Sequence, residues 1–392
     1  MIEFDKNPAQ IGTNIKIVGV GGAGGNAINT MIKNNLFGVE FIAANTDGSD
    51  LIKSKANMKL QLGKKLTRGL GTGANPDLGS RSAEESKDEI KAHLDGADMV
   101  FIAAGMGGGT GTGAAPIIAK IAREMGILTL GIVTTPFPFE GKKRAENADH
   151  GIHHLREFVD TLIVIPNKKL CEIYSGLTLA ESFNKADNVL FEAAKAVSDI
   201  INVTGLINVD FSDVKTVMQN MGYALMGTGV AEGESRAINA ARAAIDNPLL
   251  SDISLQGCQS LLLNITGGPD ILTSEFEEVS NVIVNETGKA ANIIMGVILD
   301  DSMVGKVSVT LIATGLAKEE KEKCINFPGL PQHNIPTSVN QEHTIDPEME
   351  DIIGRLTINQ QAIKEEKKPA ADEPNRIATL RTDVPSFLKA LD

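Results

Sequence analysis

The sequence predicts an α/β protein in which strands alternate with helices and form a mostly parallel sheet. A long helix then leads to a second, smaller α+β domain. The first observation is a series of short apolar segments separated by helical stretches such as Asn26–Lys33 and Ala114–Met125. Strands that alternate with helices are typical of βαβ units. The predicted strands are Asn14–Val20, Phe41–Ala44, Met99–Ala104, Thr129–Val133 and Thr161–Ile165.

The second observation is a long stretch of helical spacing at residues 179–201. Apolar residues recur there at intervals of three and four, which places them on one face of a helix. They are Leu179, Phe183, Ala186, Leu190, Ala193, Val197 and Ile201. The third observation is a set of apolar segments at 261–265, 282–284 and 307–313, which we expect to be strands of the second domain. The long helix would join the two domains.

The ends of the chain differ from this pattern. Residues 1–11 are predicted to be flexible, and 317–379 are dominated by charged residues, Pro, Gln and Asn. Such a composition buries too little apolar surface to fold, so a disordered linker is expected. Apolar residues return in Asp383–Leu391 (DVPSFLKAL), which predicts a docking peptide at 380–392. The alternative is a frayed end without a function.

The bulk composition excludes several classes of function. A formal net charge of −13 argues against nucleic-acid binding and against adhesion to an anionic membrane. Cys171, Cys258 and Cys324 form no CxxC motif, which favours a reducing cytoplasm over a disulfide framework or a zinc ribbon. Neither a signal-like start nor an apolar run of about 18 residues is present, so no membrane insertion is expected.

The strongest functional signal is the glycine-rich segment Gly105–Pro116 (GMGGGTGTGAAP), between a predicted strand and a predicted helix. Glycines let backbone N–H groups approach a phosphate without an intervening Cβ. The helix start adds free N–H groups and a favourable dipole, and Thr110 and Thr112 add hydroxyl donors. A plain glycine-rich turn is the structural alternative, but the position between strand and helix favours a phosphate loop.

A second glycine cluster, Gly19–Gly25 (GVGGAGG), also follows a strand. Alone it fits the dinucleotide fingerprint, with Glu40 near the expected spacing, and would indicate an NAD-binding enzyme. The two clusters together indicate one nucleotide held from both sides. A third segment, Gly69–Asn75 (GLGTGAN), is suited to close over the terminal phosphate. No Gly-Lys pair is followed by Ser or Thr, so a Walker A loop is absent.

Two aspartates, Asp210 and Asp213, lie in the segment NVDFSDV at 208–214. Paired carboxylates can orient a water molecule or hold a hydrated cation. The residues alone favour the other interpretation, in which an aspartate caps the N-terminus of a helix.

Other polar residues leave two interpretations open. Arg144 is suited to phosphate or sugar and Glu140 to ribose hydroxyls, but a surface pair four residues apart explains them equally well. His150, His153 and His154 share one helical stretch. No fourth ligand lies nearby, so a helix surface is favoured over a metal site.

Taken in order, these segments resemble the tubulin/FtsZ superfamily of GTPases and, within it, the FtsZ cell-division family. The resemblance covers about residues 12–316, and the GGGTGTG signature is specific to the superfamily. The matching segments are GVGGAGGNA (19–27), AANTD (43–47), GLGTGAN (69–75), GMGGGTGTGAAP (105–116), PFPFEGKKR (136–144), FNKADN (183–188) and NVDFSDV (208–214).

The resemblance implies a guanine-nucleotide site. Glu140 and Arg144 would contact the ribose, and Ala74 and Asn75 would lie near the γ-phosphate. The α- and β-phosphates would be held by Gly21, Gly22, Ala23, Gly24, Gly25, Gly108, Gly109, Thr110, Gly111, Thr112 and Gly113. The guanine pocket would consist of Asn26, Asn167, Phe183 and Asp187. The Asp187 carboxylate suits the N1–H and exocyclic amine of guanine, which adenine does not present, and Phe183 can stack on the base.

The resemblance also implies that catalysis needs two subunits. In a head-to-tail protofilament, Asn208, Asp210 and Asp213 would complete the active site of the neighbouring subunit, with Mg²⁺ on the phosphates of GTP. Hydrolysis to GDP would then weaken the contact between subunits.

On this basis the chain divides into parts with separate roles. A Rossmann-like GTP-binding domain at 12–178 is followed by a central helix at 179–205 and a tubulin-like α+β domain at 206–316. The tail at 380–392 would bind division proteins and membrane tethers, and the protein would act in the cytoplasm at the mid-cell division site.

Two features depart from the family pattern. Lys168 stands where relatives often have Asp, and the tail ends in Ala-Leu-Asp without the usual basic residues, which bears on its partners. The alternative functions are an NAD-dependent enzyme and a tubulin relative that is inert or serves outside division. Asp210 and Asp213 speak against an inert relative, and the tail peptide speaks against a plasmid-partition relative.

Overall fold

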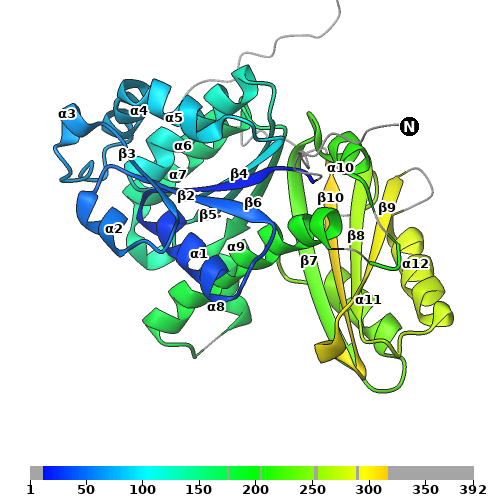
Figure 1. Ribbon diagram of the computed structural model, residues 1–392. Helices are drawn as coiled ribbons and strands as arrows, with labels where there is room; N and C mark the ends of the chain where they lie inside the picture. The colour runs from blue at the N-terminus through cyan, green and yellow to red at the C-terminus, as the bar shows by residue number, and fades with distance from the viewer. Residues whose placement is uncertain are drawn as a thin grey trace, which may run out of the picture. The chain divides into compact units, whose positions relative to one another are not determined.

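The computed structural model describes residues 12–316, except 175, 204, 208, 251–254 and 288–290 (Figure 1). Its first part contains a parallel sheet in the order β3-β2-β1-β4-β5-β6. This order is Rossmann-like, with the reversal between β1 and β4 where such sheets bind ligands. The strands are β1 (Ile15–Val20), β2 (Val39–Asn45), β3 (Met58–Gln61), β4 (Met99–Gly105), β5 (Leu128–Thr135) and β6 (Thr161–Pro166).

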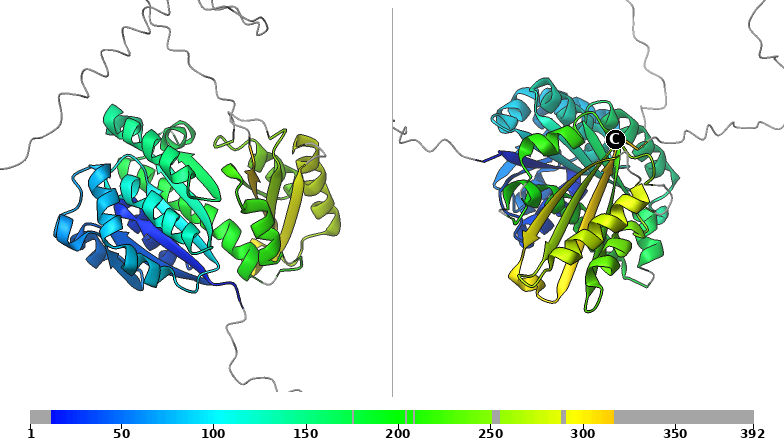
Figure 2. Two further views of the ribbon diagram at one scale, coloured as in Figure 1. Left: turned by 90° about the horizontal axis from the view of Figure 1, so that it is seen from above. Right: turned by 90° about the vertical axis from the view of Figure 1, so that its right-hand side faces the viewer.

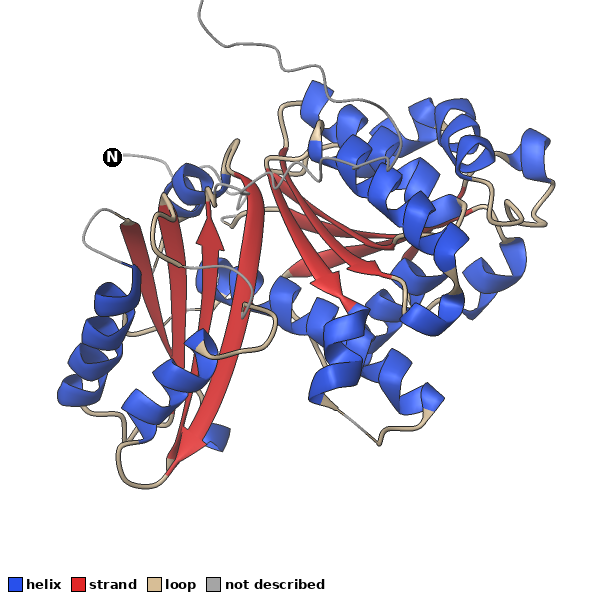
Figure 3. Ribbon diagram, turned by 180° about the vertical axis from the view of Figure 1, so that it is seen from behind, coloured by secondary structure: helices blue, strands red, loops and turns tan. Residues whose placement is uncertain are grey.

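Helices cover both faces of these strands (Figure 3). Burial on both faces explains why the strands read as continuous apolar runs rather than as alternating patterns. One face packs against α1 (Gly21–Lys33), α8 (Asn167–Ile173) and α9 (Leu179–Asn202). The other packs against α4 (Pro76–Glu85), α5 (Lys87–Leu94), α6 (Thr110–Glu124) and α7 (Lys142–Arg156). Shorter helices are α2 (Gly48–Lys53), α3 (Lys64–Thr67) and η1 (Pro138–Glu140).

The helix predicted at 179–201 is α9, and its sequence also determines where it begins. The Thr178 hydroxyl accepts the N–H of Glu181, and the Glu181 carboxylate accepts the N–H of Thr178. This capping box satisfies backbone donors that a helix start leaves unpaired. The periodic apolar face lies against the parallel sheet from Ala186 onward, whereas Leu179 and Phe183 in the first two turns are exposed.

The second part of the chain is α+β, as predicted. Its strands follow the order β7-β10-β8-β9, with β10 antiparallel to both neighbours and β9 parallel to β8. Pairing of β7 with β6 extends the sheet of the first part. Helices α11 and α12 lie side by side on one face (Figure 2). The elements are α10 (Phe211–Met218), β7 (Gly222–Glu232), α11 (Arg236–Ile245), β8 (Ser260–Gly267), α12 (Thr273–Thr287), β9 (Asn292–Leu299), η2 (Asp301–Met303) and β10 (Lys306–Thr314).

One predicted strand is wrong. Residues 282–284 lie within α12, whose buried residues Val279, Ile283 and Thr287 recur every four positions. A short run of β-branched residues does not distinguish a strand from a buried helix, and here the helical period decides. The predictions at 261–265 and 307–313 are confirmed as β8 and β10.

The helices after both glycine clusters begin earlier than predicted. Helix α1 starts at Gly21 rather than at 26, and α6 starts at Thr110 rather than at 114. Glycine lowers helix propensity, which is why the pattern placed these residues in loops. Tertiary packing prevails: a Cβ on Gly113 would lie 1.9 Å from the carbonyl oxygen of Pro76 in α4.

The predicted linker at 317–379, the tail at 380–392 and the N-terminal 1–11 lie outside the described residues. Within 12–316, no described helix combines the length and the apolar character needed to cross a membrane.

Candidate functional site

A cavity of about 410 Å³ lies where the carboxyl ends of β1, β4, β5 and β6 meet. Ligands of open parallel sheets bind at this edge, and the volume suits a small-molecule site. Many of the predicted site residues line it together: Gly21, Gly22, Ala23, Asn26, Gly108, Gly109, Thr110, Gly111, Glu140, Arg144, Asn167, Phe183 and Asp187.

Two helix N-termini border this cavity, and neither has a side-chain cap. The first turns of α1 and α6 also lack acidic residues. The two helix starts are adjacent, since a Cβ on Gly21 would lie 3.0 Å from the backbone nitrogen of Gly111. By contrast, α2 is capped by Asp47 and α4 by Asn75. Free N–H groups and two positive dipole ends suit the phosphates of a nucleotide.

A second group of lining residues comes from α8 and α9. Asn167 is 5% exposed, and its Oδ1 makes no hydrogen bond in the described part of the chain. Asp187 is also largely buried, and this desolvation raises its pKa to about 7. Both residues are acceptors that need donors from a ligand or water. Phe183 packs edge-on against Phe137, with ring centroids 5.1 Å apart. An aromatic ring beside two acceptors suits a planar base that presents N–H groups.

Glu140 and Arg144 line the same cavity and also form the pair that the sequence left open. Nη1 of Arg144 lies 2.5 Å from Oε2 of Glu140. The other carboxylate oxygen of Glu140 accepts the N–H of Phe137 at 2.9 Å. The i,i+4 pair does not exclude a role in binding, because an oxygen of a ligand can replace the Glu140 carboxylate as the acceptor of the Arg144 guanidinium.

The remaining predicted binding residues do not line this cavity. Gly24 packs α1 against the sheet, since a Cβ there would lie 2.4 Å from the carbonyl oxygen of Ala103. Gly113 similarly packs α6 against α4. Thr112 accepts the N–H of Gly107 at 2.9 Å and so fixes the preceding loop. These residues shape the site from behind, and any direct contact with nucleotide stays a prediction.

Ala74 and Asn75 lie in the loop that follows Gly69 but line a neighbouring groove instead. Asn75 caps α4 by accepting the N–H of Asp77 at 3.0 Å. Thr72 of the same loop does line the larger cavity, as do Thr134, Thr135 and Pro136. None of these four was among the predicted site residues, although Thr72 lies in the segment predicted to close over the terminal phosphate and Pro136 in the matching segment 136–144. Their signal was the position at the end of β5 or within the third glycine segment.

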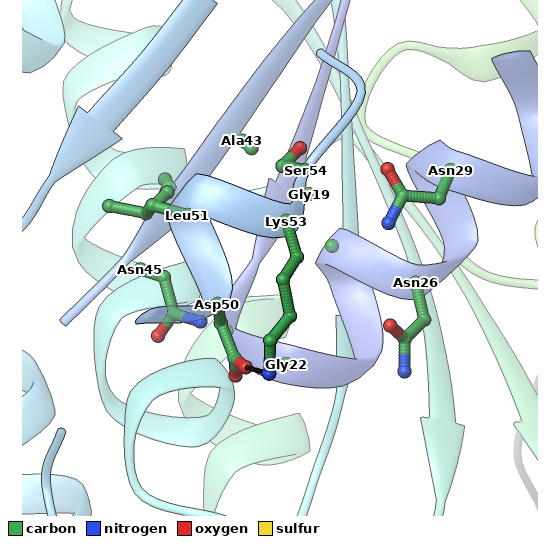
Figure 4. A pocket seen from close by; sticks show the side chains of 13 residues that line it. Gly19, Gly22, Asn26, Asn29, Ala43, Asn45, Asp50, Leu51, Lys53 and Ser54 are labelled. Carbon is green, nitrogen blue, oxygen red and sulfur yellow. Dashed lines mark ion pairs between the residues drawn. The ribbon is translucent and has the colours of Figure 1, made fainter. Parts of the chain in front are cut away.

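A much smaller cavity, of about 50 Å³, lies between α1 and α2 (Figure 4). Gly25 lines this cavity rather than the larger one, whereas Gly22 and Asn26 line both. The ion pair of Asp50 and Lys53, 3.8 Å apart, lies at its wall. Its volume is too small for a nucleotide.

Asp210 and Asp213 lie away from the lining of the cavity, at the start of α10. Asp210 is the N-cap, and its Oδ1 accepts the N–H of Asp213 at 2.9 Å. The capping interpretation is therefore correct for Asp210, which leaves a further role open. Asn208 lies outside the described residues. The histidines of α7 belong to no metal-binding cluster among the residues that the structure describes.

The fold and the cavity define a nucleotide-binding α/β protein. The family model described as "Tubulin/FtsZ family, GTPase domain" matches residues 14–175, and "FtsZ family, C-terminal domain" matches 222–317. The cell division protein FtsZ of Pseudomonas aeruginosa is 54% identical over 82% of each chain. FtsZ of Buchnera aphidicola (from Acyrthosiphon pisum) is 45% identical over 97% of this chain and 98% of its own.

Solved structures agree with these sequences. The empty FtsZ dimer of M. jannaschii has a TM-score of 0.75 at 44% identity, over 78% of this chain and 89% of its own. A GTPγS-bound CetZ2 protofilament from Haloferax volcanii shares the fold at 23% identity, with a TM-score of 0.66 over 79% and 95%. The chain belongs to the FtsZ family of tubulin-like GTPases. The GTPase domain includes the Gly19–Gly25 cluster, so the NAD-dependent alternative is set aside.

Proposed function

We propose that this GTPase completes its catalytic site only when a second subunit places the Asp210 loop against its bound GTP. As a member of the FtsZ family, the chain is a GTP-dependent polymerising protein of cell division. One observation supports the division of the site between subunits. The acidic residues that line the cavity in the described part are Glu140, which is paired with Arg144, and Asp187, which lies with the base-binding residues. A carboxylate for the attacking water must therefore come from elsewhere.

Within one subunit, the cavity residues divide by chemistry. The uncapped starts of α1 and α6 would bind the α- and β-phosphates through backbone N–H groups. Glu140 and Arg144 would bind the ribose and its surroundings. Asp187 would accept the N1–H and amino group of guanine, and Asn167 would accept a further donor from the base or from water.

Mg²⁺ fits this site as a companion of the nucleotide. The cation usually keeps several waters and binds through substrate phosphates with few protein carboxylates. The lining offers hydroxyls and backbone N–H groups but few carboxylates, which agrees with that mode. When bound, Mg²⁺ would neutralise charge on the phosphates during hydrolysis.

The catalytic loop would act across the subunit contact. Asp213 would orient the attacking water, while Asp210 would fix the loop as the α10 cap and add negative charge. Asn208 would complete the loop. Hydrolysis would therefore require head-to-tail assembly, because each bound nucleotide would need the Asp210 loop of another subunit.

A subunit-mixing experiment tests this division. Asp213→Ala subunits should bind GTP with near wild-type affinity but not hydrolyse it, and Asp187→Ala subunits should bind it poorly. Mixing the two should restore part of the phosphate release, because intact Asp213 loops then meet intact cavities. Sedimentation of both variants in one polymer without any hydrolysis would contradict a catalytic role in trans.

The tail at 380–392 would bind membrane tethers and other division proteins, and these partners would place the filament at mid-cell on the cytoplasmic side. The apolar DVPSFLKAL segment supports this, and the net charge of −13 disfavours nucleic acid as a partner. Deletion of 380–392 should leave GTP hydrolysis and assembly intact and abolish tether binding. Loss of assembly would mean that the segment serves the filament itself.

A further inference from the structure

A polar groove of about 560 Å³ lies beside the nucleotide cavity, between α4, α6 and α7. The two share walls. The first turn of α6 lines the cavity with Thr110 and the groove with Thr112. The third glycine segment lines the cavity with Thr72 and the groove with Ala74 and Asn75. A ligand that leaves the phosphate end of the cavity therefore has this groove as its neighbour.

One polar side chain of the groove is largely buried but keeps its amide open to the groove. Asn147 is 9% exposed and lines the groove, and its amide makes no hydrogen bond within the described ranges but is not fully enclosed by protein. The amide is therefore available to a water or a ligand in the groove.

The groove also gathers donors on one face of α7. Lys143, Asn147, His150 and His154 are spaced by four, three and four residues, so they share a helix face. Lys143 forms no ion pair in the described part of the chain, although its neighbour Lys142 pairs with Glu146 at 3.6 Å. Each imidazole carries at least one N–H, and Ser80 on α4 adds a hydroxyl.

Two acidic side chains lie near these donors and reduce the positive charge of the groove. Asp77 is the acidic residue among those that line the groove. Glu157 lies 3.5 Å from Nδ1 of His154, which partly occupies that histidine. Lys143, Asn147 and His150 remain as donors, and they are gathered in a chain whose net charge is −13. A small oxyanion would satisfy all three at once.

We propose that this groove is an oxyanion site that receives inorganic phosphate as it leaves the nucleotide cavity. The assignment of phosphate rests on the proposed function, because hydrolysis of GTP is its source. The wall between the two sites belongs to the third glycine segment. Gly71, Gly73 and Ala74 have left-handed backbone there, and a Cβ on Gly73 would meet no atom within 4 Å. The packing is open at Gly73 but tight beside it, since a Cβ on Gly109 would lie 2.1 Å from Oγ1 of Thr72 and 2.8 Å from the backbone nitrogen of Asn75, so the anion would pass at Gly73.

Binding is tested on the full-length protein saturated with GDP, which blocks the nucleotide cavity. Sodium phosphate is titrated at constant ionic strength against sodium chloride, and the histidine ring signals are followed by NMR, with His150→Gln to assign the relevant resonance. We expect phosphate to shift the His150 signal. Lys143→Ala should weaken binding about tenfold, the loss of one charge-assisted contact. Asn147→Leu should act in the same direction, and Lys142→Ala should leave binding unchanged.

Release is tested by single-turnover kinetics. Hydrolysis is measured in acid-quenched samples, and free phosphate is measured with a fluorescent phosphate sensor. In Lys143→Ala, the rate of hydrolysis should equal that of the wild type, while the interval between hydrolysis and the release of phosphate should change. In Lys142→Ala, both quantities should match the wild type. Equal phosphate affinity in Lys143→Ala and the wild type, or a phosphate effect that excess GDP removes, would overturn the proposal. Absent hydrolysis in the wild type would instead refute the proposed function, and the GDP-form titration would still decide whether the groove binds oxyanions.

Discussion

The hydroxyl oxygens of Thr46 and Thr110 lie 2.7 Å apart in the protein interior and join the end of β2 to the first turn of α6. Thr46 is fully buried. The Thr110 hydroxyl also lies 3.3 Å from that of Thr72 in the third glycine segment. Because Thr110 and Thr72 line the larger cavity, the buried Thr46 hydroxyl helps to position part of the cavity wall.

Thr46→Val should test this link. Valine keeps the shape of the side chain, but the Thr110 hydroxyl loses a hydrogen-bond partner in the protein interior. We expect the free energy of unfolding to fall by about 1–2 kcal/mol and GTP affinity to decrease. Thr46→Ser should preserve both. Urea unfolding and nucleotide titration measure the two quantities, and a valine variant with wild-type GTP affinity would show that the link does not orient Thr110.

Two adjacent glycines in α1 should respond in opposite directions. A Cβ on Gly24 would lie 2.4 Å from the carbonyl oxygen of Ala103, whereas a Cβ on Gly25 would meet nothing within 4 Å. Gly24→Ala should therefore lower the free energy of unfolding by about 1–3 kcal/mol or more. Gly25→Ala should leave it unchanged or raise it by up to about 1 kcal/mol. Urea unfolding of the GDP-bound proteins measures both, and equal effects would refute the packing role of Gly24.

The same pair shows what the sequence could and could not predict of the site. Glycine clusters after strands predicted a phosphate site, and a cavity does lie at the edge of the sheet where these strands end. The pattern could not separate glycines that line the cavity, such as Gly21 and Gly108, from those that let a helix pack closely, such as Gly24 and Gly113. That distinction depends on which residues lie across the interface, and sequence spacing does not contain it.

For the fold, strongly periodic elements were predictable and interrupted ones were not. Helix α9 has a capping box and a long apolar period. It begins at the predicted residue 179 and ends at 202, between the 201 indicated by the spacing and the 205 predicted for the central helix. Strand β7 was missed because Gly227 and Gly229 interrupt its apolar pattern. A Cβ at either position would lie within 2.2 Å of an α11 carbonyl oxygen, so tertiary packing selects glycine there against strand propensity.

Guanine binding should depend on pH through Asp187. Burial raises the pKa of Asp187 to about 7, above the value of about 3.9 in an unfolded chain. Only the ionised carboxylate accepts both guanine donors. GTP affinity should therefore rise by up to about tenfold per pH unit below 7 and level off above it, with a proton released on binding. Fluorescent-nucleotide titrations between pH 5.5 and 8.5 measure this.

Two variants and the pH dependence of folding stability check that prediction. Asp187→Asn should bind GTP weakly with a nearly flat pH profile. Glu192→Gln removes another carboxyl of α9 whose pKa burial also raises, but it lies outside the cavity lining and should keep the wild-type profile. Because the folded pKa of Asp187 is raised, its contribution favours the folded state at low pH. That contribution declines as pH rises from about 4 to about 7. A GTP affinity that is constant between pH 5.5 and 8.5 would contradict the role of Asp187.

Arg236 should make the second part of the chain sensitive to acid. Its side chain is 8% exposed, and its guanidinium lies 2.6 Å from Oε1 of Glu275 and 2.6 Å from Oδ2 of Asp270, which joins the starts of α11 and α12. Hydrogen bonds from Arg236 lower the pKa of both carboxyls. Groups with a lowered folded pKa stabilise the protein above their unfolded pKa, about 4, and lose that contribution as pH falls further.

Arg236→Met should therefore lower the free energy of unfolding by about 1–3 kcal/mol at pH 7. The difference from the wild type should narrow towards pH 3, where both carboxyls take up protons in either protein. The matched control is Lys306→Met, because the pair of Lys306 with Glu232 at 3.3 Å is solvent-exposed and such pairs contribute below about 1 kcal/mol. Urea unfolding of both variants and of the wild type at pH 7 and at pH 3–4 measures these differences. A difference that stays constant with pH would mean that Arg236 acts through the packing of its aliphatic stem, and not through its two carboxylate partners.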